Sequence, residues 1–235
     1  DTVTTMVNGN VKKAGNVLVE FRNVSLKYSE GGDNALSNIN FTANPGETIG
    51  IIGGTGSGKT SLVHMIPRFY DAPEGEVFVD GVNVLDYDVE SLREKIGIVM
   101  QKAVLFRGSV RENIQWGKTD ATDKEIFDAL EIAQAKEIVD GKEGGLDFII
   151  AQEGKNLSGG QRQRMTIARA VVKKPEILIL DDSASALDFA TDARLRKSIR
   201  EMKENPTVFI VSQRAASVMY ADKIIVLDDG EIAGI

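Results

Sequence analysis

The sequence contains no cysteine, and this absence removes several kinds of chemistry from consideration. Among its 235 residues no thiol is present to form a disulfide, to bind a metal or to act as a nucleophile. A chain without cysteine suits a reducing cytosol, where disulfides are rare in any case. We therefore expect no redox chemistry from this protein.

Long apolar stretches and an excess of basic charge are also missing. The longest apolar runs, such as residues 177–180 and 224–227, have the length of a strand and not the roughly 18 residues of a membrane helix. With 28 basic and 35 acidic side chains the net charge is -7, so no nucleic acid partner is expected. Residues 1–16 are polar, without the apolar core of a signal peptide, and we interpret them as a linker.

The order of periodic segments indicates an α/β fold. Three short strands near the start favour an antiparallel sheet. Beyond them, predicted strands alternate with predicted helices, which is typical of a mostly parallel sheet covered on both faces. The predicted strands are residues 17–21, 24–28, 35–42, 48–52, 76–79, 96–100, 177–180, 207–211 and 223–227, and the predicted helices are residues 60–69, 122–140, 159–173 and 192–203.

A glycine-rich segment between a predicted strand and a predicted helix gives the strongest chemical signal. It matches the pattern G-x-x-x-x-G-K-S/T of phosphate-binding loops. Glycines let successive backbone N–H groups turn toward phosphates, and the start of a helix adds positive charge. Lys59 is expected to reach the outer phosphates of ATP. The predicted ATP-binding residues here are Gly53, Gly54, Thr55, Gly56, Ser57, Gly58, Lys59, Thr60 and Ser61.

An acidic residue at the end of a later strand completes the expected magnesium site. Four apolar residues precede Asp181, which places its carboxylate at the carboxyl end of a buried strand. Ligands of open α/β sheets collect at that edge, so Asp181 and the hydroxyl of Thr60 can both serve Mg²⁺. Gln101 follows another strand, and its amide oxygen could bind the metal or position water. Taken alone, Asp181 could equally cap the next helix.

A third segment stands directly before the predicted helix of residues 159–173. Ser158 is expected to cap this helix, and the neighbouring glycines expose backbone donors that the phosphate loop of this chain does not need. We interpret the segment as a second anion-binding helix start that serves a nucleotide held by another chain, the alternative being a simple loop and cap. Its residues are Leu157, Ser158, Gly159, Gly160 and Gln161.

With this segment the sequence resembles the ABC ATPase family, whose signature it matches between the two nucleotide motifs. The resemblance covers about residues 17–235 and implies an α/β P-loop NTPase core with an N-terminal antiparallel β-subdomain. It also implies a helical subdomain, at about residues 102–172, that carries the signature. Tyr28 corresponds to the residue on which adenine stacks, Ala35 lies near the ribose, and Asp188 belongs to a loop that crosses the dimer interface.

The exporter branch of the family is indicated by three further segments, at residues 91–93, 105–108 and 112–114. The resemblance thus implies the nucleotide-binding domain of an ABC exporter at the cytoplasmic face of the membrane. Its transmembrane domain would lie upstream of this sequence.

Two positions depart from the family's pattern. Asp182 stands where the family has a glutamate as general base, and its carboxylate is drawn back by roughly 1.5 Å, whereas about 1 Å of misplacement can cost a hundredfold in rate. Gln213 stands where the family has a switch histidine, and an amide cannot carry the charge of an imidazolium. The only histidine, His64, follows the phosphate loop and is expected to be packed or at the rim.

These departures predict one half of a heterodimeric exporter. Its own site would bind Mg-ATP with little turnover, while its signature would complete the active site of a different subunit that carries the glutamate and the histidine. The isolated chain is then expected to show weak or no ATPase activity. Two alternatives are a regulatory clamp gated by nucleotide without hydrolysis, and a soluble ABC ATPase outside transport. The latter would need a coiled-coil insertion or second cassette, and the sequence has neither.

Overall fold

The central element is a six-stranded sheet, seen in a computed structural model that describes residues 17–29, 32, 34–183 and 186–235. The interpretation of residues 1–16 as a linker therefore lies outside the described residues. The strand order is β12-β11-β3-β10-β9-β6, in which β12 is antiparallel to β11 and the other neighbours are parallel. The strands are β3 (Thr48–Ile52), β6 (Ile96–Val99), β9 (Ile177–Asp181), β10 (Thr207–Ser212), β11 (Lys223–Asp228) and β12 (Glu231–Gly234).

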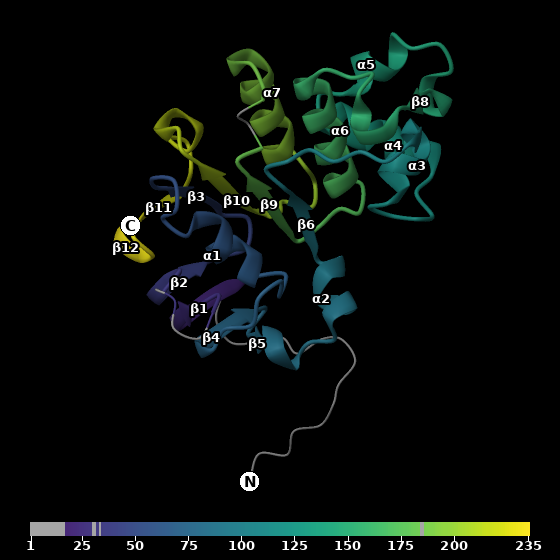
Figure 1. The fold of residues 1–235 in the computed structure, drawn as a ribbon. Coiled ribbons are helices and arrows are strands. Elements are labelled where there is room, and N and C mark those ends of the chain that lie inside the picture. The colour runs from purple at the N-terminus through teal and green to yellow at the C-terminus, as the bar shows by residue number, and fades with distance from the viewer. Residues whose placement is uncertain (1–16, 30–31, 33, 184–185) are drawn as a thin grey trace.

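A second sheet, antiparallel with the order β2-β1-β4-β5, lies at the lower left of Figure 1. The sequence predicts separate strands at residues 17–21 and 24–28, but the structure has one strand, β1. Its pairing shifts register between Phe21 and Val24. Asn23 has a left-handed φ of 50° there, so the strand is irregular without leaving the sheet. The strands are β1 (Val19–Leu26), β2 (Leu36–Ala43), β4 (Glu74–Val79) and β5 (Val82–Asn83).

Seven α-helices occur in the described part of the chain, and α3 to α6 gather at one end of the central sheet, at the upper right of Figure 1. A short two-stranded sheet of β7 (Gly108–Ser109) and β8 (Ile149–Ile150) lies among them. Within the described ranges, no helix combines the length and apolar character needed to cross a membrane. The helices are α1 (Lys59–Met65), α2 (Val89–Glu94), α3 (Val110–Gln115), α4 (Asp123–Ile132), α5 (Lys136–Asp140), α6 (Gly159–Val171) and α7 (Phe189–Arg200).

Two predicted helices are too long. The helix predicted at residues 122–140 is two helices, α4 and α5, because Gln134 between them has a left-handed φ of 57° and ends the first. The helix predicted at residues 60–69 ends at Met65. Pro67 follows at once, and a proline cannot continue the hydrogen-bond ladder of a helix.

Side-chain caps set the start of the other helices. The helix predicted at residues 192–203 begins three residues earlier, because Asp188 accepts a hydrogen bond from a backbone N–H of the first turn of α7. The short helices α2 and α3 are not predicted from periodicity, yet each starts after a capping residue, Asp88 and Ser109 respectively. Ser109 forms a full capping box with Glu112.

The central sheet separates two apolar cores. Successive side chains of a strand point to opposite faces, so Ile177 and Ile179 of β9 join the core that contains α1 and the antiparallel sheet. Leu178 and Leu180 join the core that contains α3 to α7. Asp181 follows two residues after Ile179 and therefore lies on the α1 side of the sheet.

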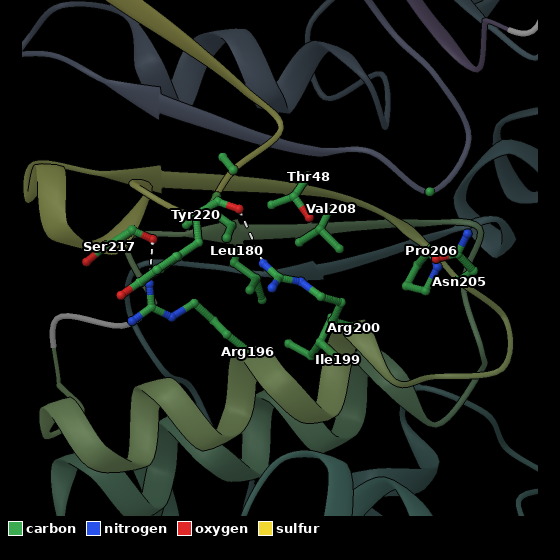
Figure 2. A pocket seen from close by; sticks show the side chains of 13 residues that line it. Thr48, Leu180, Arg196, Ile199, Arg200, Asn205, Pro206, Val208, Ser217 and Tyr220 are labelled. Atoms are coloured by element: carbon green, nitrogen blue, oxygen red, sulfur yellow. Dashed lines mark hydrogen bonds between the residues drawn. The ribbon is translucent and has the colours of Figure 1, made fainter.

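A cavity of about 40 Å³ lies between α7 and the central sheet (Figure 2). Its walls combine apolar side chains, among them Val208, with two arginines of α7. The Arg196 guanidinium donates a hydrogen bond to the backbone oxygen of Ser217 at 2.9 Å, and that of Arg200 donates to the backbone oxygen of Tyr220 at 3.3 Å. The two arginines thereby fasten α7 to the segment that follows β10.

We expect Val208→Ile to stabilise the protein, because the added methyl group enters this cavity. One buried methylene contributes about 0.8 kcal/mol, so the free energy of unfolding measured in urea should rise by roughly that amount. Val99→Ile is the matched control, since Val99 is buried in the same core but does not line the cavity. It should lose about 1 to 3 kcal/mol through overpacking. Equal losses for both variants would show that the cavity cannot accept a methyl group.

Candidate functional site

The carboxyl ends of four neighbouring strands bring the predicted site residues together. Because β3, β10, β9 and β6 are parallel, these ends lie at one edge of the sheet. The glycine-rich segment of residues 53–60 follows β3, and Gln213 comes directly after β10. Asp181 is the last residue of β9, with Asp182 next to it, and Gln101 lies just beyond β6. Residues that are distant in the sequence therefore lie together at the carboxyl edge of the central sheet.

A cavity of about 330 Å³ opens at this edge. Its volume falls within the range of small-molecule sites. Two of its lining residues, Val211 and Ser212, were not predicted as site residues. The predicted residues that line it are Tyr28, Ala35, Thr55, Gly56, Gly58, Lys59, Thr60, Ser61, Gln101, Asp181, Asp182 and Gln213.

The glycines of the loop are required by close backbone contacts at two positions. A Cβ at Gly58 would lie 2.6 Å from the Ala35 backbone oxygen, and the residue has a left-handed φ of 94°. A Cβ at Gly53 would lie 2.2 Å from the Leu227 backbone oxygen. At Gly54, by contrast, a Cβ would meet nothing within 4 Å. The loop is therefore clamped at its ends and open between them, where backbone N–H groups can approach an anion.

Lys59 lies inside this loop. Its Nζ donates hydrogen bonds to the backbone oxygens of Gly53 at 2.8 Å and Gly54 at 2.6 Å. Burial lowers the pKa of the Lys59 ammonium, and the carboxylates of Asp182 and Asp181 act in the opposite direction. The two carboxylates lie at the end of β9 and oppose the positive charge of the Lys59 ammonium across the cavity lining.

The oxygen donors beside Lys59 fit Mg²⁺. The Thr60 hydroxyl donates a hydrogen bond to Asp181 Oδ1 at 3.0 Å, so hydroxyl and carboxylate already face each other. The Gln101 amide nitrogen donates to Asp182 Oδ2 at 3.3 Å and brings an amide oxygen to the same wall. The described residues contain no cluster of three or more His, Asp or Glu that could bind a metal alone. A mixed set with few carboxylates suits Mg²⁺, which keeps several waters and binds phosphate oxygens.

His64 lies near the carboxylates, and of the two positions expected for it the structure shows the packed one; its contact with Asp181 was not predicted. It is buried, and its Nε2 lies 3.4 Å from Asp181 Oδ2. The signal was present in the spacing, because residues four apart, such as Thr60 and His64, share one face of a helix. His64 is thus a packed residue and does not lie at the rim.

An exposed aromatic ring forms another wall of the cavity. Tyr28 is 59% exposed, and its hydroxyl lies 2.6 Å from Ser61 Oγ. Its ring meets the ring of Tyr70 edge-on, with the centroids 5.2 Å apart. The contacts with Ser61 and Tyr70 fix the Tyr28 side chain, while its ring stays exposed and can stack with a flat ligand.

The segment Leu157 to Gln161 lies elsewhere and does not line the cavity. The predicted cap is confirmed: Ser158 Oγ accepts from the Gln161 backbone at 3.2 Å, and Gln161 Oε1 accepts from the Ser158 backbone at 2.9 Å. Gly160 packs closely, since a Cβ there would lie 3.1 Å from the Ala186 backbone oxygen. Ser158 and Gly159 are exposed, so this helix start faces outward.

The nearby Asp188 is exposed and caps α7. Its carboxylate accepts hydrogen bonds from the Thr191 backbone at 2.9 Å and the Thr191 hydroxyl at 2.7 Å. These bonds lower the pKa of the Asp188 carboxyl. The dimer-interface role predicted for Asp188 is separate from this cap and stays a prediction.

Comparison with known proteins gives consistent matches. A family model described as ABC transporter matches residues 36–185. The chain is 46% identical over 214 residues to the Bacillus subtilis protein named "Uncharacterized ABC transporter ATP-binding protein YfiB", covering 91% of this chain and 37% of that protein. It is 41% identical over 215 residues to the ATP-dependent lipid A-core flippase of Hahella chejuensis, covering 91% of this chain and 37% of the flippase.

The solved structures include a similar fold. A bacterial Atm1-family ABC exporter with ATP bound superposes with a TM-score of 0.89 at 32% identity, covering 94% of this chain and 39% of that one. The chain thus spans well under half the length of these relatives.

The cap of α7 predicts a pH-dependent stability. Because the folded-state pKa of Asp188 lies below the ordinary aspartate value of about 3.9, its contribution is complete above that value and is lost as the pH falls through the folded pKa. Asp188→Asn keeps a capping side chain but cannot ionise. Wild type should therefore melt above Asp188→Asn at about pH 6, and the gap should shrink toward about pH 3.

Asp188→Ala is the control, since it lacks the cap at every pH. Its melting temperature should stay below that of Asp188→Asn by an amount that changes little with pH. A gap between wild type and Asp188→Asn that is constant down to about pH 3 would contradict the role of the ionised carboxylate.

Proposed function

Because this chain belongs to the ABC transporter family, we propose that it is an ATP-binding domain that holds Mg-ATP in the cavity at the carboxyl edge of the central sheet. One observation carries the proposal. The hydrogen bond of 3.0 Å between the Thr60 hydroxyl and Asp181 joins the phosphate loop to the acidic strand, beside the buried ammonium of Lys59. A loop that carries a lysine and a hydroxyl, facing a carboxylate, is suited to a nucleotide phosphate with its metal.

The cavity offers a partner for each part of ATP. The open ring of Tyr28 would stack with adenine, and the backbone near Ala35 would lie against the ribose. Backbone N–H groups of the loop would receive the phosphates, and Lys59 would exchange its contacts with backbone oxygens for contacts with phosphate oxygens. Ionic hydrogen bonds of this kind are about twice as strong as neutral ones.

Three side chains would hold the magnesium ion: Thr60, Gln101 and Asp181. When bound, Mg²⁺ supplies positive charge that neutralises the phosphate oxygens. The Thr60 hydroxyl is already hydrogen-bonded to Asp181, and the Gln101 amide contacts the neighbouring Asp182, so the three side chains line the same cavity.

The same geometry favours slow hydrolysis at this site. A general base must reach the attacking water, and the Asp182 carboxylate is shorter than a glutamate and is engaged by the Gln101 amide at 3.3 Å. Gln213 is exposed at the cavity and offers a neutral amide where an imidazolium would stabilise developing charge. We therefore infer that the site binds ATP well and turns it over poorly.

The outward-facing signature is better suited to a second nucleotide. Two such domains, placed head to tail, would put Leu157, Ser158, Gly159, Gly160 and Gln161 of this chain against ATP held by a partner, with Asp188 at the interface. Residues 17–235 would belong to this domain, with a helical part at about residues 102–172. The partner would carry the missing glutamate and histidine, as the other half of an exporter whose transmembrane domain places both at the cytoplasmic face of the membrane.

A second candidate function rests on the same two residues. If Asp182 and Gln213 both fail in catalysis, the domain could act as a clamp that closes on ATP without hydrolysis at either site. The two functions differ only in whether the signature of this chain supports turnover by the partner.

Binding and turnover by the 235-residue chain test the proposal directly. Wild type should bind Mg-ATP and release phosphate slowly. Lys59→Ala should weaken binding by about 2 to 3 kcal/mol, because it removes a charge-assisted contact to phosphate. Lys197→Ala, on the exposed face of α7, is the control and should leave the Kd unchanged. Calorimetric titration gives the Kd, and a phosphate-release assay gives the rate. Equal affinity for wild type and Lys59→Ala would mean that the loop does not bind phosphate.

Restoring the two departures should restore turnover. In the heterodimer, Asp182→Glu combined with Gln213→His should raise ATPase activity at this chain's own site, with the partner's site disabled at its glutamate. The double variant should exceed the sum of the single variants, because a base and an oriented phosphate act together.

The complementary variant is Gly160→Asp, measured with the partner's site intact. It places a side chain 3.1 Å from the Ala186 backbone oxygen and a negative charge at the signature, so hydrolysis at the partner's site should be lost. Full activity of Gly160→Asp would contradict the shared site. A heterodimer that releases no phosphate, with or without these variants, would favour the clamp.

A further inference from the structure

A buried imidazole next to the acidic strand has an unused hydrogen-bonding atom. His64 lies in α1 with 6% of its surface exposed, and its Nε2 has no hydrogen-bond partner among the described residues. Buried polar atoms are nearly always paired, because an unpaired one loses its contact with water without replacement. The position of this atom therefore calls for an explanation.

The atom faces a carboxylate. Nε2 of His64 lies 3.4 Å from Asp181 Oδ2, slightly beyond an ordinary hydrogen bond, and the Asp181 side chain is 2% exposed. The other oxygen, Oδ1, accepts a hydrogen bond of 3.0 Å from Thr60. Since Thr60 and His64 are four residues apart on one helix face, α1 places a hydroxyl beside one oxygen of this carboxylate and an imidazole nitrogen beside the other.

Aromatic packing fixes the imidazole in this place. The ring of Phe69 meets it edge-on at 5.4 Å, and the ring of Tyr70 lies nearly parallel to it at 6.5 Å. Tyr70 in turn packs edge-on against Tyr28, whose ring walls the nucleotide cavity. The imidazole thus has little freedom to turn away from Asp181.

We propose that His64 is a positioning residue for Asp181: Nε2 lies 3.4 Å from Oδ2, and in the complex with ATP its N–H would donate to this oxygen and fix the carboxylate in the orientation that binds the metal. The inference rests on the proposed Mg-ATP site. Donors that orient a metal-serving carboxylate typically change metal affinity by 10 to 100-fold when removed. A histidine that only fills space would instead alter stability and leave metal affinity as it was.

Glutamine separates the two roles. Its side-chain amide reaches about as far from the backbone as Nε2 of histidine and carries a donor without a positive charge. Leucine fills the site without a donor. His64→Gln should therefore retain most of the effect on the metal, and His64→Leu should lose it.

The test measures metal affinity apart from turnover. Mn²⁺, which has the same preference for oxygen ligands, is titrated into the 235-residue chain with ATP present, and free Mn²⁺ is followed by electron paramagnetic resonance. His64→Leu should weaken Mn²⁺ binding by about 10 to 100-fold, and His64→Gln by less than about 5-fold. Binding of ATP without metal should be the same in all of them. Met65→Leu, a buried neighbour on α1, is the control and should match wild type.

Three results would overturn the inference. Wild-type Mn²⁺ affinity in folded His64→Leu would show that the imidazole does not position Asp181. An equal loss in His64→Gln and His64→Leu would indicate a packing role. A wild-type chain that binds ATP without any gain from Mn²⁺ would remove the proposed metal site itself, which distinguishes failure of the proposed function from failure of the role of His64. If His64→Leu does not fold, His64→Met takes its place, because its side chain also fills the site without an N–H donor.

Discussion

Parallel pairing of β3, β10, β9 and β6 is the constraint on which the rest of the site depends. Parallel strands end at the same edge, so the loop after β3 and the carboxylates at the end of β9 meet although 121 positions separate Thr60 from Asp181. The strands are buried on both faces, which is why they read as almost unbroken apolar runs. Each apolar run ends at this edge of the sheet, so the packing of the strands determines where the polar residues of the site lie.

Sequence reasoning succeeded where one local pattern determines one structure. The glycine-rich loop and the cap at Ser158 follow from short-range geometry, and the apolar run before Asp181 identifies a buried strand. It failed where the structure depends on a single backbone conformation. The left-handed Gln134 that divides α4 from α5 has no sequence signal, since glutamine is an ordinary helix residue. Asn23 likewise permits one irregular strand where turn residues indicated two.

The contact of His64 with Asp181 shows a third limit. Periodicity assigns the histidine to a helix and its spacing from Thr60 assigns it a face. Which strand lies opposite that face depends on the strand order, and β9 is separated from β3 by β10. Strand order follows from packing over the whole chain, so a contact of this kind becomes visible only in three dimensions.

The hydrogen bonds of Arg196 and Arg200 connect α7 to the segment after β10, and this connection has a mechanical consequence. Arg196 pairs with Asp192 at 2.5 Å and holds the Ser217 backbone at 2.9 Å, within a few residues of Gln213. The other end of α7 begins at Asp188, outside the nucleotide cavity. A helix of this length resists bending, so α7 forms a stiff connection between the outer surface at Asp188 and the segment that follows β10. Leu195 and Ile199 of α7 are buried in the core beside the sheet, so a displacement of α7 would reach the backbone at Ser217 and this core together.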